Sequence, residues 1–275
     1  MPAVARLTSV RADPLLVATV TSLFAALVAL VVLAVRGELG VLIAPRTGPR
    51  LALVGALGTA LAFFLFYAGT SRTSAIEAAL GLQVEPIYAL VGAWAVLGHR
   101  PTLRRVVSVL VLLAGLALAL GGRGLGSGIG VWLLLATPFC WQLSHLVVLR
   151  GLPGVPPPVL TGARYVYGGA MLVVAWLALG GTRSELVALA PALPLLALQG
   201  IVLAYLGTIA WYAAIARLDL ARTTAIVVPS IPVLSLGATF VLVGEVPTLR
   251  QALGLLLTAA GILAFVRAPH VEARQ

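Results

Sequence analysis

The chain has 275 residues, of which 61% are hydrophobic and 9% charged, with a mean hydropathy of +1.11, whereas a soluble domain carries about 25% charged residues. This composition excludes a globule with a water-compatible surface, and the continuous apolar runs exclude a β-barrel, whose strands alternate apolar and polar residues. The net charge of +10 comes from arginines scattered between apolar runs, so we expect no nucleic-acid partner, which would need a clustered basic face.

Nine apolar segments follow one another along the chain, most of them close to the ~20 residues that a helix needs to cross a bilayer. They cover residues 14–35, 51–69, 74–97, 105–121, 129–148, 158–180, 192–215, 221–243 and 250–266. The sequence therefore predicts an all-α, polytopic transmembrane helix bundle. Eleven arginines fall in one set of alternate loops and six in the other. Because cytoplasmic loops are the richer in arginine, we expect a multi-pass protein of a bacterial inner (plasma) membrane with a cytoplasmic C-terminus.

The second half of the chain repeats part of the first. The heptapeptide GHRPTLR at Gly98–Arg104 recurs 146 residues later as GEVPTLR at Gly244–Arg250, and Pro86 and Pro232 are separated by the same offset. The arginine bias of the flanking loops inverts between the two copies. The sequence therefore predicts an inverted repeat about an axis in the membrane plane, which in many secondary transporters builds two equivalent gates around one central site.

These duplicated motifs resemble the EamA-type branch of the drug/metabolite transporter superfamily. In the first copy they are Tyr67-Ala68, Ala75, Glu85-Pro86, Gly98 and Pro101–Arg104, and in the second Tyr212-Ala213, Ala221, Pro232, Gly244-Glu245 and Pro247–Arg250. The resemblance implies repeats at residues 14–121 and 128–267, ten helices in two inverted five-helix bundles, and export of small metabolites or amino acids. His99 departs from the family, because it stands where a glutamate is expected, although the second copy keeps Glu245.

The first repeat is one helix short of this 5+5 pattern, which makes the chain 4+5. Segment 14–35 aligns with 158–180, so no first-half segment corresponds to 129–148. Residues 1–13 read as an ordinary interhelical loop. We expect that Met1 is an internal methionine and that the true start codon lies upstream, so that the sequence lacks the first helix. The alternative is a nine-helix protein in which another chain fills the position of that helix.

Glu85 is the main candidate for a site residue, because it lies near the middle of span 74–97, where a charge costs at least about 2.5–3.5 kcal/mol. Pro86 follows it and removes a backbone hydrogen bond, which leaves carbonyls free to face a cavity. Helical periodicity puts Gly81, Glu85 and Tyr88 on one stripe. We expect Glu85 to bind a substrate amine or a proton; a protonated acid hydrogen-bonded within the bundle is the alternative.

Glu77 lies on the same stripe but has a second explanation. Ser74 to Glu77 has the form of a capping box, which satisfies two amide donors at the start of a helix. We therefore expect Glu77 to cap its helix.

Further candidates lie on other spans. Arg164, six residues into span 158–180, either snorkels to the interface or holds an anionic substrate or an acid. Trp141 and His145 lie on a polar and aromatic face of span 129–148, and Tyr205 and Trp211 lie on such a face of span 192–215. Faces of this kind suit the wall of a binding site. Aromatic residues near helix ends also serve as anchors at the membrane interface.

Prolines interrupt corresponding helices of the two repeats, at Pro86 in the first and at Pro229 and Pro232 in the second. Paired interruptions of this kind point to a substrate site near the midplane of the membrane.

We therefore expect a secondary transporter that exports a small amino-acid-like or amphipathic metabolite by alternating access. The alternatives are an intramembrane enzyme with Glu85 and His145 as acid and base, and a membrane partner protein that does not transport. The sequence has no Gly-x-x-x-x-Gly-Lys loop, His-x-x-x-His or Cys-x-x-Cys, so we expect no metal, no cofactor and no ATP-driven transport. The expected partners are a small-molecule substrate and the lipid bilayer, and a homodimer is left open.

Overall fold

The computed structural model describes residues 2–10, 12–97, 102–120, 128–214, 217 and 230–267, and every regular element within them is a helix. In the first half these are α1 (Pro2–Ser9), α2 (Pro14–Val35), α3 (Leu39–Ile43), α4 (Gly48–Gly55), the π-helical segment η1 (Ala56–Leu61), α5 (Ala62–Thr70), α6 (Ala75–Gly81), the 3₁₀ turn η2 (Leu82–Val84), α7 (Glu85–Leu97) and α8 (Leu103–Leu120). In the second half they are α9 (Ile129–Gly151), α10 (Pro157–Ala178), α11 (Arg183–Leu189), the 3₁₀ turn η4 (Ala190–Ala192), α12 (Leu193–Ala197), the π-helical segment η5 (Leu198–Leu206), helical residues 207–214, α14 (Ser230–Val243) and α15 (Leu249–Val266).

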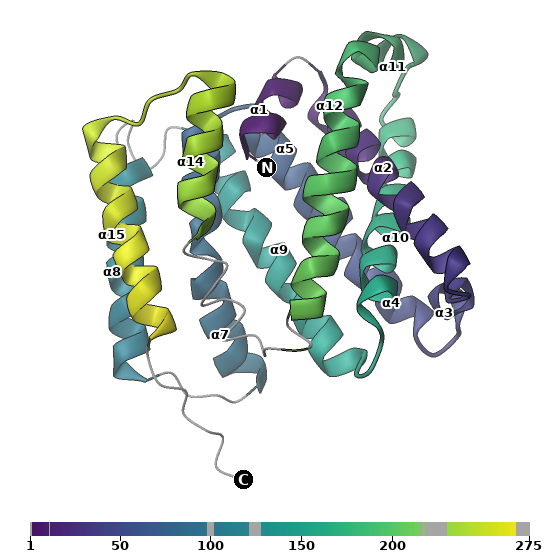
Figure 1. The fold of residues 1–275 in the computed structure, drawn as a ribbon, viewed down its shortest axis with the longest axis horizontal. Coiled ribbons are helices and arrows are strands. Elements are labelled where there is room, and N and C mark those ends of the chain that lie inside the picture. The colour runs from purple at the N-terminus through teal and green to yellow at the C-terminus, as the bar shows by residue number, and fades with distance from the viewer. Residues whose placement is uncertain are drawn as a thin grey trace.

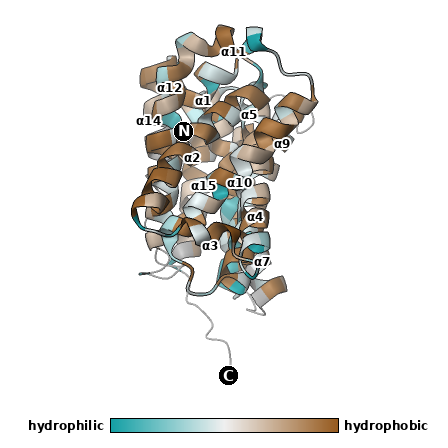
Figure 2. Ribbon diagram, turned by 90° about the vertical axis from the view of Figure 1, so that its right-hand side faces the viewer, coloured by the Kyte–Doolittle hydropathy of each residue, from teal (hydrophilic) through white to brown (hydrophobic). Residues whose placement is uncertain are grey.

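Seven helices within the described residues are long and apolar enough to cross a membrane. They run over Pro14–Val35, Gly48–Thr70, Ala75–Val96, Leu103–Leu120, Ile129–Gly151, Pro157–Ala178 and Arg183–Ala214. A shorter apolar helix covers Leu249–Phe265, and α14 is the described part of the predicted span 221–243. Hydrophobic residues predominate along the helices (Figure 2). The prediction of a polytopic, all-α membrane protein is confirmed.

The long helices stand side by side in one bundle, with α8 and α15 at one edge and α2, α10 and α3 at the opposite edge (Figure 1). Helices α8 and α15 touch through their backbones. A Cβ added at Gly115 would lie 2.5 Å from the amide nitrogen of Thr258, and one added at Gly254 would lie 2.7 Å from the carbonyl oxygen of Gly115. Glycines bring helices this close in membranes, where packing and not water exclusion holds them together.

The start of α2 follows from its sequence. The Asp13 carboxylate accepts a hydrogen bond from the Leu16 amide at 3.0 Å, and Pro14 fills the first turn, where no amide donor is needed. The helix stops before Gly37, whose φ of 67° lies in the left-handed region that favours glycine.

The expectation of a loop before Pro14 is wrong, because Pro2–Ser9 form helix α1. This helix packs against α5, α6 and α14, and most of its side chains are buried. Arg6 Nη1 donates to the carbonyl oxygens of Thr70 at 3.1 Å and Ser71 at 2.9 Å, which closes the C-terminal end of α5. An eight-residue segment is too short to show a spanning pattern, and a helix of that length depends on packing against its neighbours.

Two of the spans contain π-helical segments, a rare conformation that is frequent at functional sites. Segment η1 packs against α9 and α10, and segment η5 packs against α2. Each has a glycine at a tight contact, Gly58 in η1 and Gly200 in η5. The π-helical segments therefore face neighbouring helices at close range.

Candidate substrate-binding site

The span Ala75–Val96 is broken beside Glu85. Helix α6 ends at Gly81, the turn η2 follows, and α7 begins at Glu85 with Pro86 as its second residue. Proline fits this position because the first amides of a helix have no intrahelical partner. The carboxylate thus lies at a junction between two helical segments inside a membrane span.

The predicted capping box at the other end of α6 is confirmed. Ser74 Oγ accepts a hydrogen bond from the Glu77 amide at 3.0 Å, and Glu77 Oε2 accepts one from the Ser74 amide at 2.9 Å. Glu77 is therefore engaged in holding the start of the helix.

The stripe that carries Glu85 faces α9. Gln142 Nε2 donates a hydrogen bond to Glu85 Oε1 at 3.0 Å. A Cβ added at Gly81 would lie 3.2 Å from a leucine side chain of α9. The Tyr88 ring packs edge-on against Phe139, with the two centroids 5.5 Å apart. Helix α9 is thus the wall opposite Glu85.

Arg164 lies on α10 and is only 6% exposed. Its Nη2 donates a hydrogen bond to the Gly58 carbonyl oxygen in η1. A Cβ added at Gly58 would lie 2.9 Å from Arg164 Nε and 2.7 Å from Ser144 Oγ. Ser144 Oγ in turn donates to the Val54 carbonyl oxygen at 3.2 Å. A glycine in η1 therefore lets a guanidinium and a hydroxyl reach the backbone together.

His145 lies in an aromatic cluster with the helical residues 207–214. Its ring stacks on Trp211 at 6.1 Å between centroids and meets Tyr212 edge-on at 6.0 Å. Neither ring nitrogen of His145, nor Trp211 Nε1, nor Tyr212 Oη has a hydrogen-bond partner among the described residues. Buried polar groups usually have partners, so this cluster presents several open donors and acceptors.

The charges of the site are separated from one another. Glu85 and Arg164 both lie against α9, Glu85 through the hydrogen bond from Gln142 and Arg164 beside Ser144. Within the part of the chain that the structure describes, the one ion pair joins Arg36 and Glu38 in the loop after α2, so Arg164 and Glu85 do not pair directly. Each instead has a neutral hydrogen-bond partner, a backbone carbonyl for the cation and Gln142 for the carboxylate.

The other candidate residues lie in different places. Trp141 is on α9, and its Nε1 is buried without a hydrogen-bond partner in the described residues. Tyr205 is on η5, buried with residues of α2 and α5, and not in the His145 cluster. Pro232 is the third residue of α14, whereas Pro229 and His99 lie outside the described residues.

A carboxylate of the second half binds the start of a helix of the first half. Glu245 Oε1 accepts a hydrogen bond from the Ala75 amide and Oε2 accepts one from the Ile76 amide, each at 3.3 Å. These amides form the partly positive N-terminal end of α6. Glu245 therefore links the two halves of the chain at one end of the bundle.

Two residues of the site are not singled out by sequence patterns. Gln142 is a polar residue inside an apolar run, which is a usable signal. Gly58 has no such signal, because its role depends on the π-helical segment and on a partner 106 residues away.

Comparison with known proteins shows what the chain is similar to. The sequence profile of the EamA-like transporter family matches residues 1–121 and 128–267. The chain is 29% identical over 231 residues to a "Probable terminal-alkyne amino-acid exporter" of Streptantibioticus cattleyicolor, and this match covers 79% of the chain and 73% of that relative. A solved structure described only as the crystal structure of a protein has a TM-score of 0.64 at 20% identity and covers 96% of this chain and 95% of that one. The last similarity concerns the fold alone.

Proposed function

Because this chain belongs to the EamA-like transporter family, we propose that it is a secondary transporter that exports a small amino-acid-like metabolite by alternating access. Its membrane is the bacterial inner membrane, with the C-terminus in the cytoplasm. Arg164 binds the carboxylate of the substrate, and Glu85 binds its amino group.

The observation that carries this proposal is the buried guanidinium without an acid. A charge inside a membrane span is costly unless it is compensated, and Arg164 has a backbone carbonyl as its described hydrogen-bond partner. Its Nε is buried without a hydrogen-bond partner among the described residues. A substrate carboxylate would supply the missing anion, and a carboxylate with a guanidinium forms strong, charge-assisted hydrogen bonds.

The chemistry of Glu85 complements that of Arg164. An amino acid carries an ammonium and a carboxylate, and the site holds one acid and one base that are not paired with each other. The relative from Streptantibioticus cattleyicolor, a "Probable terminal-alkyne amino-acid exporter", supports the same substrate class. The aromatic rings of His145, Trp211 and Tyr212 would contact the side chain of the substrate.

Repeated features of the two halves support alternating access by an inverted repeat of 4+5 helices. Helices α8 and α15 have bounds that differ by 146 residues at both ends. Gly55 and Gly200, which are 145 residues apart, each meet another helix closely: a Cβ at Gly55 would lie 2.9 Å from Ala163 O in α10, and one at Gly200 would meet Thr21 O in α2. Helices α2 and α10 are themselves counterparts in the repeat, so each half uses a glycine to contact the other.

The test is efflux of radiolabelled amino acids from proteoliposomes that contain the purified chain. We expect efflux of at least one amino acid, no efflux of its decarboxylated amine, and loss of efflux in Arg164→Gln and in Glu85→Gln. Arg183→Gln and Glu77→Gln are matched controls, because Arg183 is exposed and Glu77 caps a helix. Normal efflux in both site variants, with equal amounts of inserted protein, would contradict the proposal.

A further inference from the structure

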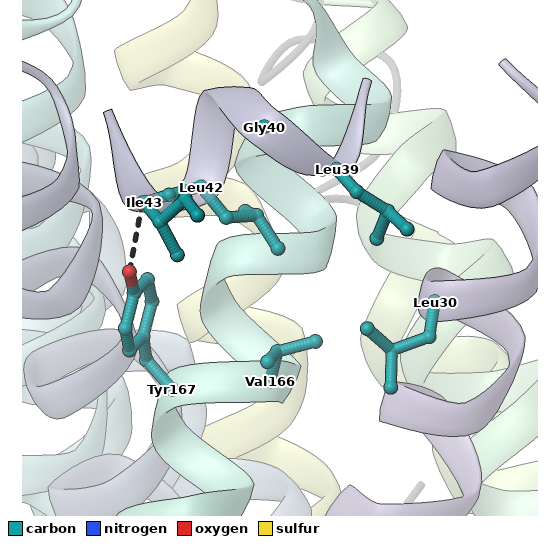
Figure 3. Close-up of a pocket in the computed structure, with 7 residues that line it drawn as sticks. All are labelled: Leu30, Leu39, Gly40, Leu42, Ile43, Val166 and Tyr167. Carbon is teal, nitrogen blue, oxygen red and sulfur yellow. Dashed lines mark hydrogen bonds between the residues drawn. The ribbon is translucent and has the colours of Figure 1, made fainter. Parts of the chain in front are cut away.

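An apolar pocket of about 350 Å³ opens at the edge of the bundle between α2, α3 and α10. It is lined by Leu30, Leu39, Gly40, Leu42, Ile43, Val166 and Tyr167 (Figure 3). Its volume is within the range of about 300–1,000 Å³ that small-molecule sites occupy. Leu30, Leu39 and Ile43 are exposed, so the pocket opens to the outside of the bundle near the end of the span Pro14–Val35.

The walls of this pocket are held in place by hydrogen bonds. The Tyr167 hydroxyl donates to the Leu42 carbonyl oxygen at 2.7 Å, which ties α3 to α10 (Figure 3). Thr47 Oγ1 donates to the Val41 carbonyl oxygen at 3.1 Å at the end of α3. At its start, Arg36 makes two hydrogen bonds to Glu38, at 2.9 and 2.8 Å. The pocket is therefore part of an ordered loop and not a gap between loose side chains.

Arginines surround the short helix α3. Arg36 is neutralised by Glu38, because the hydrogen-bonded guanidinium lowers the pKa of that carboxylate and keeps it charged. Arg46, three residues after the last residue of α3, is exposed and has no ion pair among the described residues. Arg50, beside the same loop, donates to the neutral Gly151 carbonyl oxygen at 3.0 Å and has no ion pair among the described residues. The loop therefore has a net positive charge next to an apolar pocket.

We propose that this pocket is a binding site for an anionic phospholipid, with one acyl chain between α2, α3 and α10 and the phosphate at Arg46. Basic residues at the membrane surface attract anionic headgroups, and an adjacent apolar pocket converts that attraction into a defined site. The site is at the edge of the bundle, on different residues from the Arg164–Glu85 site. It therefore does not depend on which substrate the protein exports.

Native mass spectrometry of the detergent-purified chain tests the proposal with phosphatidylglycerol and phosphatidylcholine of identical acyl chains. The wild type should retain phosphatidylglycerol preferentially. Arg46→Gln should lower that preference by about fivefold, the factor that corresponds to roughly 1 kcal/mol for one arginine near an anionic headgroup. Arg183→Gln, which removes an exposed arginine on α11, should leave the preference unchanged.

The acyl-chain part of the proposal is tested by filling the pocket. A Cβ at Gly40 meets no atom within 4 Å, so Gly40→Phe can project into the pocket, and Gly237→Phe on α14 is the control because Gly237 is equally open. Gly40→Phe should lose retention of both lipids, whereas Gly237→Phe should not. Equal retention of the two lipids by the wild type, or equal losses in a variant and its control, would overturn the proposal. Arg46 is exposed, so its variant decides the headgroup part even if Gly40→Phe does not fold.

Discussion

Gly58→Ala is the smallest change that should disturb the candidate site. The added methyl carbon would lie 2.7 Å from Ser144 Oγ and 2.9 Å from Arg164 Nε, whereas ordinary contact begins at 3.4 Å. Both side chains would have to retreat by about half an ångström or more. Arg164 is held by the carbonyl of the same residue, so it cannot retreat without weakening that hydrogen bond.

The expected cost is that of overpacking a buried site, about 1–3 kcal/mol. If this cost falls on the position of the guanidinium, substrate affinity should fall by roughly five- to 150-fold, since 1.4 kcal/mol corresponds to a factor of ten. In proteoliposome efflux assays the loss should appear as a higher KM.

Gly207→Ala is the matched control for Gly58→Ala. Gly207 has helical φ and ψ angles of −61° and −44°, and a Cβ there meets no atom within 4 Å. This variant should transport normally and be as stable as the wild type or more stable by roughly 0.5–1 kcal/mol, because alanine favours a helix. If Gly58→Ala is inserted in normal amounts and transports with an unchanged KM, the geometry assigned to Arg164 is wrong.

Three further predictions concern the ends of the spans. Glu245→Gln removes the charge that meets the start of α6, so we expect a loss of about 0.3–1 kcal/mol in a thermal unfolding assay and an altered efflux rate; an unchanged rate would argue against a link between the halves that matters for transport. Ser74→Ala removes the side chain that accepts the hydrogen bond from the Glu77 amide, so it should cost about 0.5–2 kcal/mol through the lost cap with efflux unchanged per folded molecule, and a defect in efflux alone would contradict a purely capping role. In a Cys140→Ser background, a cysteine at Arg46 should be labelled from the cytoplasm and one at Arg72 from outside; the reverse pattern would refute the orientation.

Hydropathy predicts the spans well because the cost of leaving a polar group in lipid is local to each segment. Pro14–Val35 matches its predicted range of 14–35. Helix α1 could not be found in this way. Its eight residues are helical because α5, α6 and α14 surround them, which depends on residues far away in the sequence.

The candidate site was predictable only in part. Glu85, a carboxylate next to a proline inside an apolar run, is recognisable in the sequence. So are Arg164 of α10 and the aromatic residues of spans 129–148 and 192–215. Which partners these residues have could not be predicted, because Gln142 is 57 residues from Glu85 and Gly58 is 106 residues from Arg164. The π-helical segments have no compositional signature, so the close approach that Gly58 permits could only come from the structure.

The way in which Arg164 is stabilised has a consequence for the resting protein. Its described hydrogen-bond partner is a carbonyl dipole and not a carboxylate, so no acid among the described residues offsets the guanidinium. Fixed positive charge in a narrow path is the device by which water channels turn away protons and metal cations. In the proposed transport path, Arg164 would repel cations while no substrate is bound. The carboxylate of an incoming substrate would lower that barrier only for the molecule that carries it.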